Sequence, residues 1–137
     1  MDKDTDIIGW DTETHRIGPG AIHPQIVCLQ VCDGSTTEVI SRCEDSFKDS
    51  LLELFNTDHD CIRVAQNSAF DLGVVYSHEP ELLPAIFQML EDGRLTCTRL
   101  REKFLNLTSH GDLQYHTVGD STTKINYSLS DLVMRYF

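Results

Sequence analysis

The order of apolar segments in the first half of the chain limits the folds open to it more than any other feature. Three short segments have the length and composition of strands, over residues 6–13, 25–33 and 36–42. A segment with apolar side chains at helical spacing follows over residues 44–56, and a fourth strand-like segment over residues 61–67. Strands followed by a helix and a further strand predict an α/β domain with a mixed sheet.

The second half of the chain is predicted to be mainly helical. Its apolar spacing indicates helices over residues 69–77, 80–92, 99–107 and 128–137, and a short strand over residues 94–98. Residues 108–126 are polar without a clear period and are predicted to form a loop. No linker separates two cores, so residues 1–137 are expected to form a single domain.

The charge of the chain argues against nucleic-acid binding over its whole surface. The sequence has 22 acidic and 11 basic residues and a formal net charge of −11, whereas binding to phosphates needs Lys and Arg. Four of the basic residues lie within ten positions: Arg94, Arg99, Arg101 and Lys103. They form either a solvated helix face or a local patch that contacts phosphate.

The apolar runs of the sequence are too short to span a membrane, and the first residues, "MDKDTD", are acidic and polar. We therefore expect a soluble, cytoplasmic protein with no membrane partner. Its five cysteines are expected to be reduced thiols.

Two carboxylates stand one residue apart at the end of the first predicted strand. In "GWDTET", residues 9–14, Asp11 and Glu13 project from one face, because successive side chains of a strand alternate. Two like charges on one face repel each other unless a cation lies between them. The fourth predicted strand ends in "AQNSAFD", which brings Asp71 to the start of a helix. The ends of neighbouring strands in an α/β sheet form the crevice in which ligands bind.

The motifs at these two junctions resemble those of the DEDD superfamily of 3′–5′ exonucleases. "DTET" is similar to the first motif of that family, Asp-x-Glu, and "NSAFD", with Asn67, Phe70 and Asp71, is similar to its second, Asn-x-x-x-Asp. Within the superfamily, the chain looks most like the proofreading domains of family A (DNA polymerase I-like) polymerases and like ribonuclease D. The resemblance implies a ribonuclease H-like α/β fold, with a mixed sheet flanked by helices.

The resemblance also implies hydrolysis assisted by two Mg²⁺ or Mn²⁺ ions. Two such ions, about 3.5–4 Å apart, stabilise the attacking and the leaving oxygen of a phosphodiester, and these hard ions prefer oxygen ligands. Asp11 would bridge both ions, Glu13 would hold one of them, and Asp71 would hold the other. These three carboxylates are the implied catalytic and metal-binding residues.

Four further residues have substrate-binding roles by the same resemblance. Thr12 would offer its backbone N–H to the terminal nucleotide, and Ile17 would contact the 3′-terminal base. Phe70 would stack on a base, a contact that tolerates any sequence, and Asn67 would form a hydrogen bond near the phosphate.

The implied partner is the 3′ end of single-stranded DNA or RNA, with DNA proofreading as the first expectation and a polymerase domain or partner chain as a further partner.

Taken one at a time, the same residues allow another interpretation. Asp11 and Glu13 could be solvated charges at a sheet edge, and Phe70 could be an ordinary core residue. The chain would then be an incomplete nuclease-fold module that binds nucleic acid or protein.

The fourth carboxylate of the family comes from a third motif, Tyr-x-x-x-Asp or His-x-x-x-Asp. "YSLSD", from Tyr127 to Asp131, has this spacing, but "SLSDLVMRYF" looks more like the helix that precedes the third motif. We therefore expect the third motif beyond residue 137, which would leave the domain incomplete at its C-terminus. The chain alone is then expected to degrade single-stranded DNA slowly or not at all.

Overall fold

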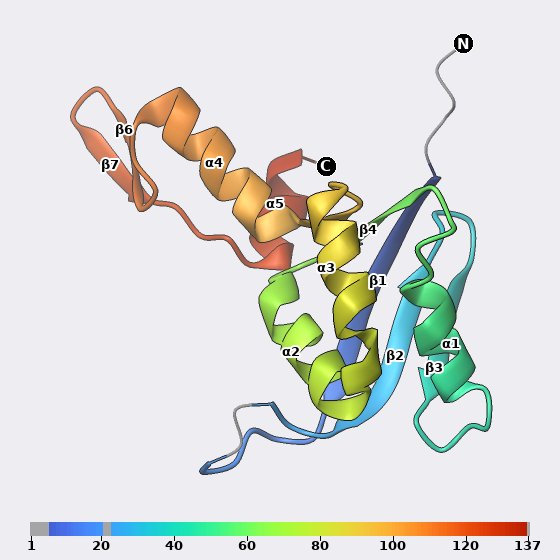
Figure 1. Cartoon of the computed structure of the whole chain (residues 1–137). Coiled ribbons are helices and arrows are strands. Elements are labelled where there is room, and N and C mark those ends of the chain that lie inside the picture. Colours follow the sequence, from blue (N-terminus) through green and yellow to red (C-terminus); the bar gives the residue numbers. More distant parts are fainter. Residues whose placement is uncertain (1–5, 21–22, 137) are drawn as a thin grey trace. The chain divides into compact units, whose positions relative to one another are not determined.

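The computed structural model describes residues 6–20 and 23–136 (Figure 1). Five strands form one mixed sheet in the order β3-β2-β1-β4-β5. Their bounds are β1 Asp6–Thr14, β2 Ile26–Cys32, β3 Thr37–Ser41, β4 Cys61–Ala65 and β5 Leu95–Cys97. β1 is antiparallel to β2, β2 is antiparallel to β3, and β4 is parallel to β1 on its other side. The predicted mixed sheet flanked by helices is confirmed, with the fourth strand beside the first.

The chain divides into two compact units, residues 1–96 and 97–137. The helices of the first unit are α1 Phe47–Leu54, α2 Ser68–His78, the 3₁₀ turn η1 Pro80–Leu82 and α3 Leu83–Glu91. The second unit contains α4 Thr98–His110, the hairpin of β6 Tyr115–Val118 and β7 Ser121–Lys124, and α5 Leu129–Tyr136. In the part of the chain that the structure describes, no helix combines the length and apolarity needed to cross a bilayer.

The core of the first unit lies on one face of the sheet. Trp10 of β1 and Leu29 of β2 are buried there against side chains of α1, α2 and α3, and the Trp10 ring packs edge-on against Phe55 at 5.4 Å. The opposite face leaves Ile7 58% and Val39 63% exposed. Because side chains alternate along β1, Asp11 and Glu13 belong to this open face, on the other side of the strand from the core residue Trp10.

Residues 108–126 were predicted as a loop, and this prediction is wrong for the hairpin of β6 and β7. The β7 side chains are all exposed, so the strand has no alternation of apolar and polar residues for a pattern to detect. Gly119, at φ 60°, takes the left-handed conformation in the turn between the two strands. The predicted helix over residues 80–92 is also divided, because η1 forms its first turn.

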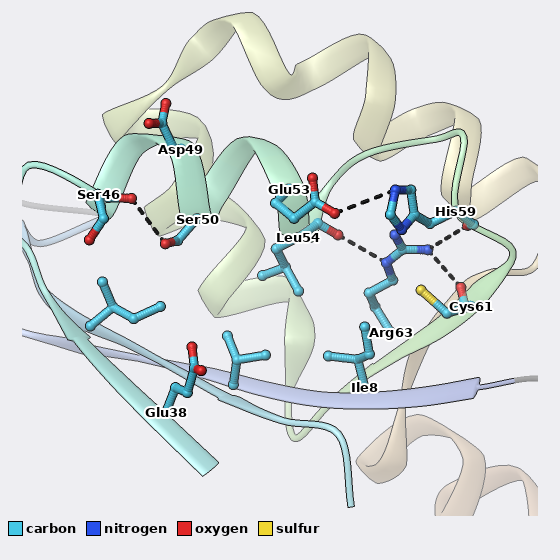
Figure 2. A pocket seen from close by; sticks show the side chains of 12 residues that line it. Ile8, Glu38, Ser46, Asp49, Ser50, Glu53, Leu54, His59, Cys61 and Arg63 are labelled. Carbon is cyan, nitrogen blue, oxygen red and sulfur yellow. Dashed lines mark hydrogen bonds and ion pairs between the residues drawn. The ribbon is translucent and has the colours of Figure 1, made fainter. Parts of the chain in front are cut away.

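The charged residue in the middle of β4 is buried. Arg63 is 1% exposed, and its guanidinium donates hydrogen bonds to the carbonyl oxygens of Leu54 (2.9 Å), Asn56 (2.9 Å), His59 (3.1 Å) and Cys61 (2.7 Å). Figure 2 shows three of these contacts, where the side chain reaches from β4 towards the end of α1. Burial lowers the pKa of Arg63. The side chain therefore ties the α1–β4 connection to the sheet.

Candidate active site

Parallel pairing of β1 and β4 places the two motifs at one edge of the sheet. The pairing runs from Asp6 opposite Cys61 to Gly9 opposite Val64. β1 then continues through Asp11 and Glu13, while β4 ends at Ala65 and the chain turns into α2. The Asp-x-Glu residues therefore lie beside the turn from which α2 begins, as the strand-end argument predicts.

The turn between β4 and α2 depends on the backbone conformation of Asn67. Asn67 has φ 58° and ψ 40°, and it is the one residue other than glycine with a positive φ in the described ranges 6–20 and 23–136. Asparagine tolerates this left-handed conformation better than most residues. Its carbonyl oxygen accepts the N–H of Phe70 at 3.0 Å, which helps to close the first turn of α2. This backbone role accounts for an asparagine here, alongside the substrate contact that the family resemblance implies.

Asp71 is held against β1 by Thr12. Asp71 is 3% exposed, and its Oδ1 accepts the Thr12 N–H at 3.1 Å and the Thr12 hydroxyl at 2.6 Å. Burial raises the pKa of Asp71 even though these two hydrogen bonds favour the charged form. Thr12 therefore positions a carboxylate, and its N–H is engaged by Asp71 where we expected it to face a nucleotide.

Asp11 experiences the charges of both other carboxylates. Burial, followed by repulsion from Asp71 and from Glu13, raises the pKa of Asp11 to about 6. Glu13 is exposed, and its Oε1 accepts a weak hydrogen bond from Gln30 Nε2 at 3.4 Å. Among the described ion pairs, none joins Asp11, Glu13 or Asp71 to a Lys, Arg or His. Among the residues that the structure describes, the negative charge of these three carboxylates is therefore not compensated by an ion pair.

This donor set fits a hard divalent cation in its chemistry. Carboxylate oxygens are the ligands that Mg²⁺ prefers, and a cation would relieve the repulsion that raises the pKa of Asp11. Within residues 6–20 and 23–136, however, no three His, Cys, Asp or Glu side chains are arranged to hold a metal ion as they stand. Metal binding at this site would therefore require the carboxylate side chains to adjust.

The other predicted site residues differ in their surroundings. Phe70 is half-buried and packs against the core of the first unit, while Asn67 is exposed at the start of α2. Ile17 lies between β1 and β2 with 66% of its surface exposed. The structure joins Thr12 to Asp71 by hydrogen bonds. Asp11 lies on the opposite face of β1, yet close enough to Asp71 for its charge to add to the effect of burial on the pKa of Asp11.

The Tyr127–Asp131 spacing has a structural explanation in the second unit. The Ser128 hydroxyl donates to Asp131 Oδ2 and accepts the Asp131 N–H at 3.2 Å, which caps the start of α5. The Tyr127 hydroxyl donates to the carbonyl oxygen of Leu113 at 2.8 Å. The Ser-x-x-Asp pattern before an apolar run was the sequence signal for this cap.

Sequence reasoning missed two supporting contacts of the site. One is the pair of bonds from Thr12 to Asp71. The other is the packing of His23 on Gly73, where an added Cβ would lie 2.1 Å from His23 Cε1. A glycine inside a predicted helix was the available signal for the second contact, because glycine costs about 1 kcal/mol there relative to alanine.

The pKa of Asp11 leads to a prediction for the metal-free protein. The native pKa of about 6 exceeds the model-peptide value of 3.8, so the folded chain holds this proton more tightly than the unfolded chain. Ionisation of Asp11 therefore lowers stability as the pH rises from about 4 to about 6. Asp11→Asn is expected to raise the melting temperature by a few degrees at pH 7.5 and to have no effect at pH 3.5. That shift corresponds to about 1 kcal/mol after allowance for partial exposure.

Thermal melts at both pH values in EDTA measure this effect. Asp58→Asn, in an exposed loop, is the matched control and should leave the melting temperature unchanged at either pH. An Asp11→Asn shift that is the same at pH 3.5 and pH 7.5 would contradict the charge repulsion described here.

Together, the mixed sheet and the carboxylates at the end of its central strand define a ribonuclease H-like α/β domain of the nuclease type. A family model described as 3′–5′ exonuclease matches residues 1–137. The chain therefore belongs to the 3′–5′ exonuclease domain family, as its two motifs predicted.

The comparison with solved structures agrees on the fold. The exonuclease domain of Aedes aegypti Nibbler superposes with a TM-score of 0.57 at 14% sequence identity, over 95% of this chain. The matched region spans 58% of that chain. No curated protein matches the sequence.

Proposed function

We propose that the chain removes nucleotides from the 3′ end of single-stranded nucleic acid by two-metal-ion hydrolysis, with Asp11, Glu13 and Asp71 as the metal ligands. The observation that carries the proposal is the buried carboxylate of Asp71, which two hydrogen bonds from Thr12 hold beside the Asp-x-Glu motif of β1. Burial, and then repulsion from Asp71 and Glu13, raises the pKa of Asp11. Ligands for divalent cations are arranged so that they repel one another until the cation is bound.

Each residue of the proposed site has a separable role. Bound Mg²⁺ or Mn²⁺ would supply an activated water and stabilise the charge that develops on the leaving oxygen. Asp71 would hold its ligand position because Thr12 fixes one of its oxygens. Asp11 would contact both ions, and the exposed Glu13 would be the third carboxylate ligand, on the solvent side. Phe70, Asn67 and Ile17 would contact the terminal nucleotides.

We further propose DNA as the substrate and proofreading beside a polymerase domain as the setting. The support for this finer proposal is the similarity of "DTET" and "NSAFD" to the motifs of family A polymerase proofreading domains. A 2′-hydroxyl distinguishes RNA from DNA at such sites, so parallel assays with oligonucleotides of the same sequence test the choice. Faster loss of 3′ nucleotides from the RNA strand would contradict it.

The first test is metal-linked stability. A ligand that binds only the folded chain stabilises it by about 2.7 kcal/mol at 100 times its dissociation constant. Millimolar Mg²⁺ or Mn²⁺ should therefore raise the melting temperature of the wild-type chain and of Asp58→Asn, but not that of Asp11→Asn. Titration calorimetry that detects no binding at millimolar metal would contradict the proposed metal site.

The second test is the direction of cleavage. Cleavage by this chain is expected to be slow, so enzyme in excess over a 5′-labelled single-stranded oligonucleotide, followed over a long incubation, should give a ladder that shortens one nucleotide at a time from the 3′ end. A circular single strand, which has no 3′ end, should resist. Binding of the oligonucleotide with no ladder and no metal-linked stabilisation would instead support a non-hydrolytic binding module, the alternative favoured by the lack of a ready-made three-ligand group in the described residues.

A further inference from the structure

A second feature of the first unit fits a nucleic-acid strand. A cavity of about 410 Å³ lies between the start of β2, the last turns of α2 and the residue that follows β3. Its polar lining consists of His23, Gln25, Arg42, Ser77 and His78. Among the residues that the structure describes, no acidic residue lines it, although the chain has 22 acidic and 11 basic residues. A cavity with this lining favours an anion.

The cavity in Figure 2 provides a contrast within the same unit. It has a volume of about 440 Å³ and lies between α1 and the sheet, with an apolar floor that includes Ile8. Its charged and imidazole side chains are the three carboxylates of Glu38, Asp49 and Glu53, together with His59 and Arg63. The Arg63 guanidinium is already bonded to four carbonyl oxygens. The negative charges of these carboxylates repel a phosphate, which is also negative. The acid-free lining of the first cavity is therefore a local property and does not reflect the chain as a whole.

His23 reaches the acid-free cavity because α2 has a glycine at position 73. A Cβ on Gly73 would lie 2.1 Å from Cε1, 2.5 Å from Nδ1 and 2.7 Å from Nε2 of His23, so the imidazole fills the place of a side chain. His23 Nδ1 is buried, and it has no hydrogen-bond partner among the residues that the structure describes. A buried ring nitrogen without a partner is costly, and a ligand in the cavity would offset this cost if the imidazole turned towards it.

The two other basic groups that line the cavity are Arg42 and His78. The Arg42 backbone N–H donates to the carbonyl oxygen of Val27 at 2.9 Å, which fixes the residue beside β2, and no described carboxylate pairs with its side chain. The His78 ring is oriented by an edge-on contact with Phe47 at 5.5 Å. Guanidinium and imidazole N–H groups are common ligands of phosphate oxygens.

Two elements, α2 and β2, connect the cavity to the carboxylate site. Asp71 and Ser77 are six residues apart on α2, which is about 9 Å along a helix axis. Ile26, at the start of β2, pairs with Thr14, the residue after Glu13. A strand whose terminal nucleotide contacts the carboxylates could therefore place a neighbouring phosphate here.

We propose that this cavity is a phosphate subsite, in which Arg42, His23 and His78 bind a backbone phosphate of the single strand whose 3′ end lies at Asp11 and Asp71. The inference rests on the proposed function, because it takes the ligand to be the substrate strand. Gly73 is a positioning residue for the subsite, since it gives His23 its place against α2. The subsite would hold the strand in the site without taking part in hydrolysis.

The test is strand affinity under conditions that prevent hydrolysis. The binding of a fluorescein-labelled oligothymidylate in EDTA at low salt is followed by fluorescence anisotropy. Arg42→Gln is expected to weaken binding about tenfold, and to lower the slope of log affinity against log salt by about 0.7, the value for one lost phosphate contact. Lys124→Gln, which removes one exposed positive charge from β7, should change affinity less than about twofold.

A second variant tests the position of the His23 imidazole against Gly73 without removing a charged group. Gly73→Ala should displace the imidazole and weaken binding as much as His23→Ala, and the double variant should bind no more weakly than either single variant. Wild-type affinity in both Arg42→Gln and Gly73→Ala overturns the subsite, while hydrolysis that depends on Asp11 would still support the proposed function. A wild-type chain that binds no oligonucleotide and gives no 3′ ladder overturns both.

Discussion

Asp71→Asn is expected to abolish metal-dependent removal of 3′ nucleotides while leaving the chain folded. Asparagine has the shape of aspartate and keeps an oxygen that can accept both Thr12 hydrogen bonds. It lacks the negative charge needed to bind a divalent cation. We expect the rate to fall by a factor on the order of 10² or more, as when one charge-stabilising group is lost from an active site.

The stability of the same variant separates a catalytic role from a structural one. Burial raises the pKa of Asp71, so its charged form is costly in the metal-free fold and Asp71→Asn should melt at or above the wild-type temperature in EDTA. In Mg²⁺ the order should reverse, because only the wild type gains the full stabilisation of the bound ion. Asp58→Asn is again the matched control, with wild-type rate and stability. Undiminished laddering by Asp71→Asn would remove Asp71 from the proposed metal site.

The sheet and the neighbourhood of the site were predictable from the sequence because they depend on local patterns. The apolar segments before Asn67 have the periods of strands and of one helix, and few topologies arrange such a series. The positions of Asp11 and Asp71 followed from the rule that the ends of neighbouring strands meet. Both inferences needed the order of elements and no side-chain detail.

The supporting contacts were not predictable because they join segments that are far apart in the sequence. The Thr12–Asp71 bonds span 59 residues, and they require α2 to return to the buried face of β1. The packing of His23 on Gly73 likewise depends on how a loop folds back onto a helix. The hairpin of β6 and β7 was missed for another reason, since exposed strands carry no apolar alternation.

The contacts of Arg63 in the core could not be predicted from the sequence either. The sequence "CIRVA" predicted a strand, but not that its arginine would be buried with no carboxylate paired to it among the described residues. Its four acceptors are backbone carbonyls in or near the α1–β4 connection. Removing an ion pair from a core can be neutral, because both charged partners are replaced by apolar groups. The acceptors of Arg63 are backbone carbonyls, which no substitution removes. Replacing Arg63 with an apolar residue would therefore leave them without a donor.

Arg63→Met is therefore expected to lower the free energy of unfolding by about 2–6 kcal/mol. The carbonyls of Leu54 and Cys61 accept their bonds in buried surroundings, and each buried acceptor that loses its donor costs about 1–3 kcal/mol. The bonds to Asn56 and His59 are only partly buried, so water can replace them at little cost. Urea unfolding should show a lower midpoint with an unchanged slope. Arg101→Met, on an exposed position of α4, is the control and should stay within about 0.5 kcal/mol of the wild type. An Arg63→Met chain as stable as the control would show that the cost of desolvating the guanidinium offsets the bonds it makes.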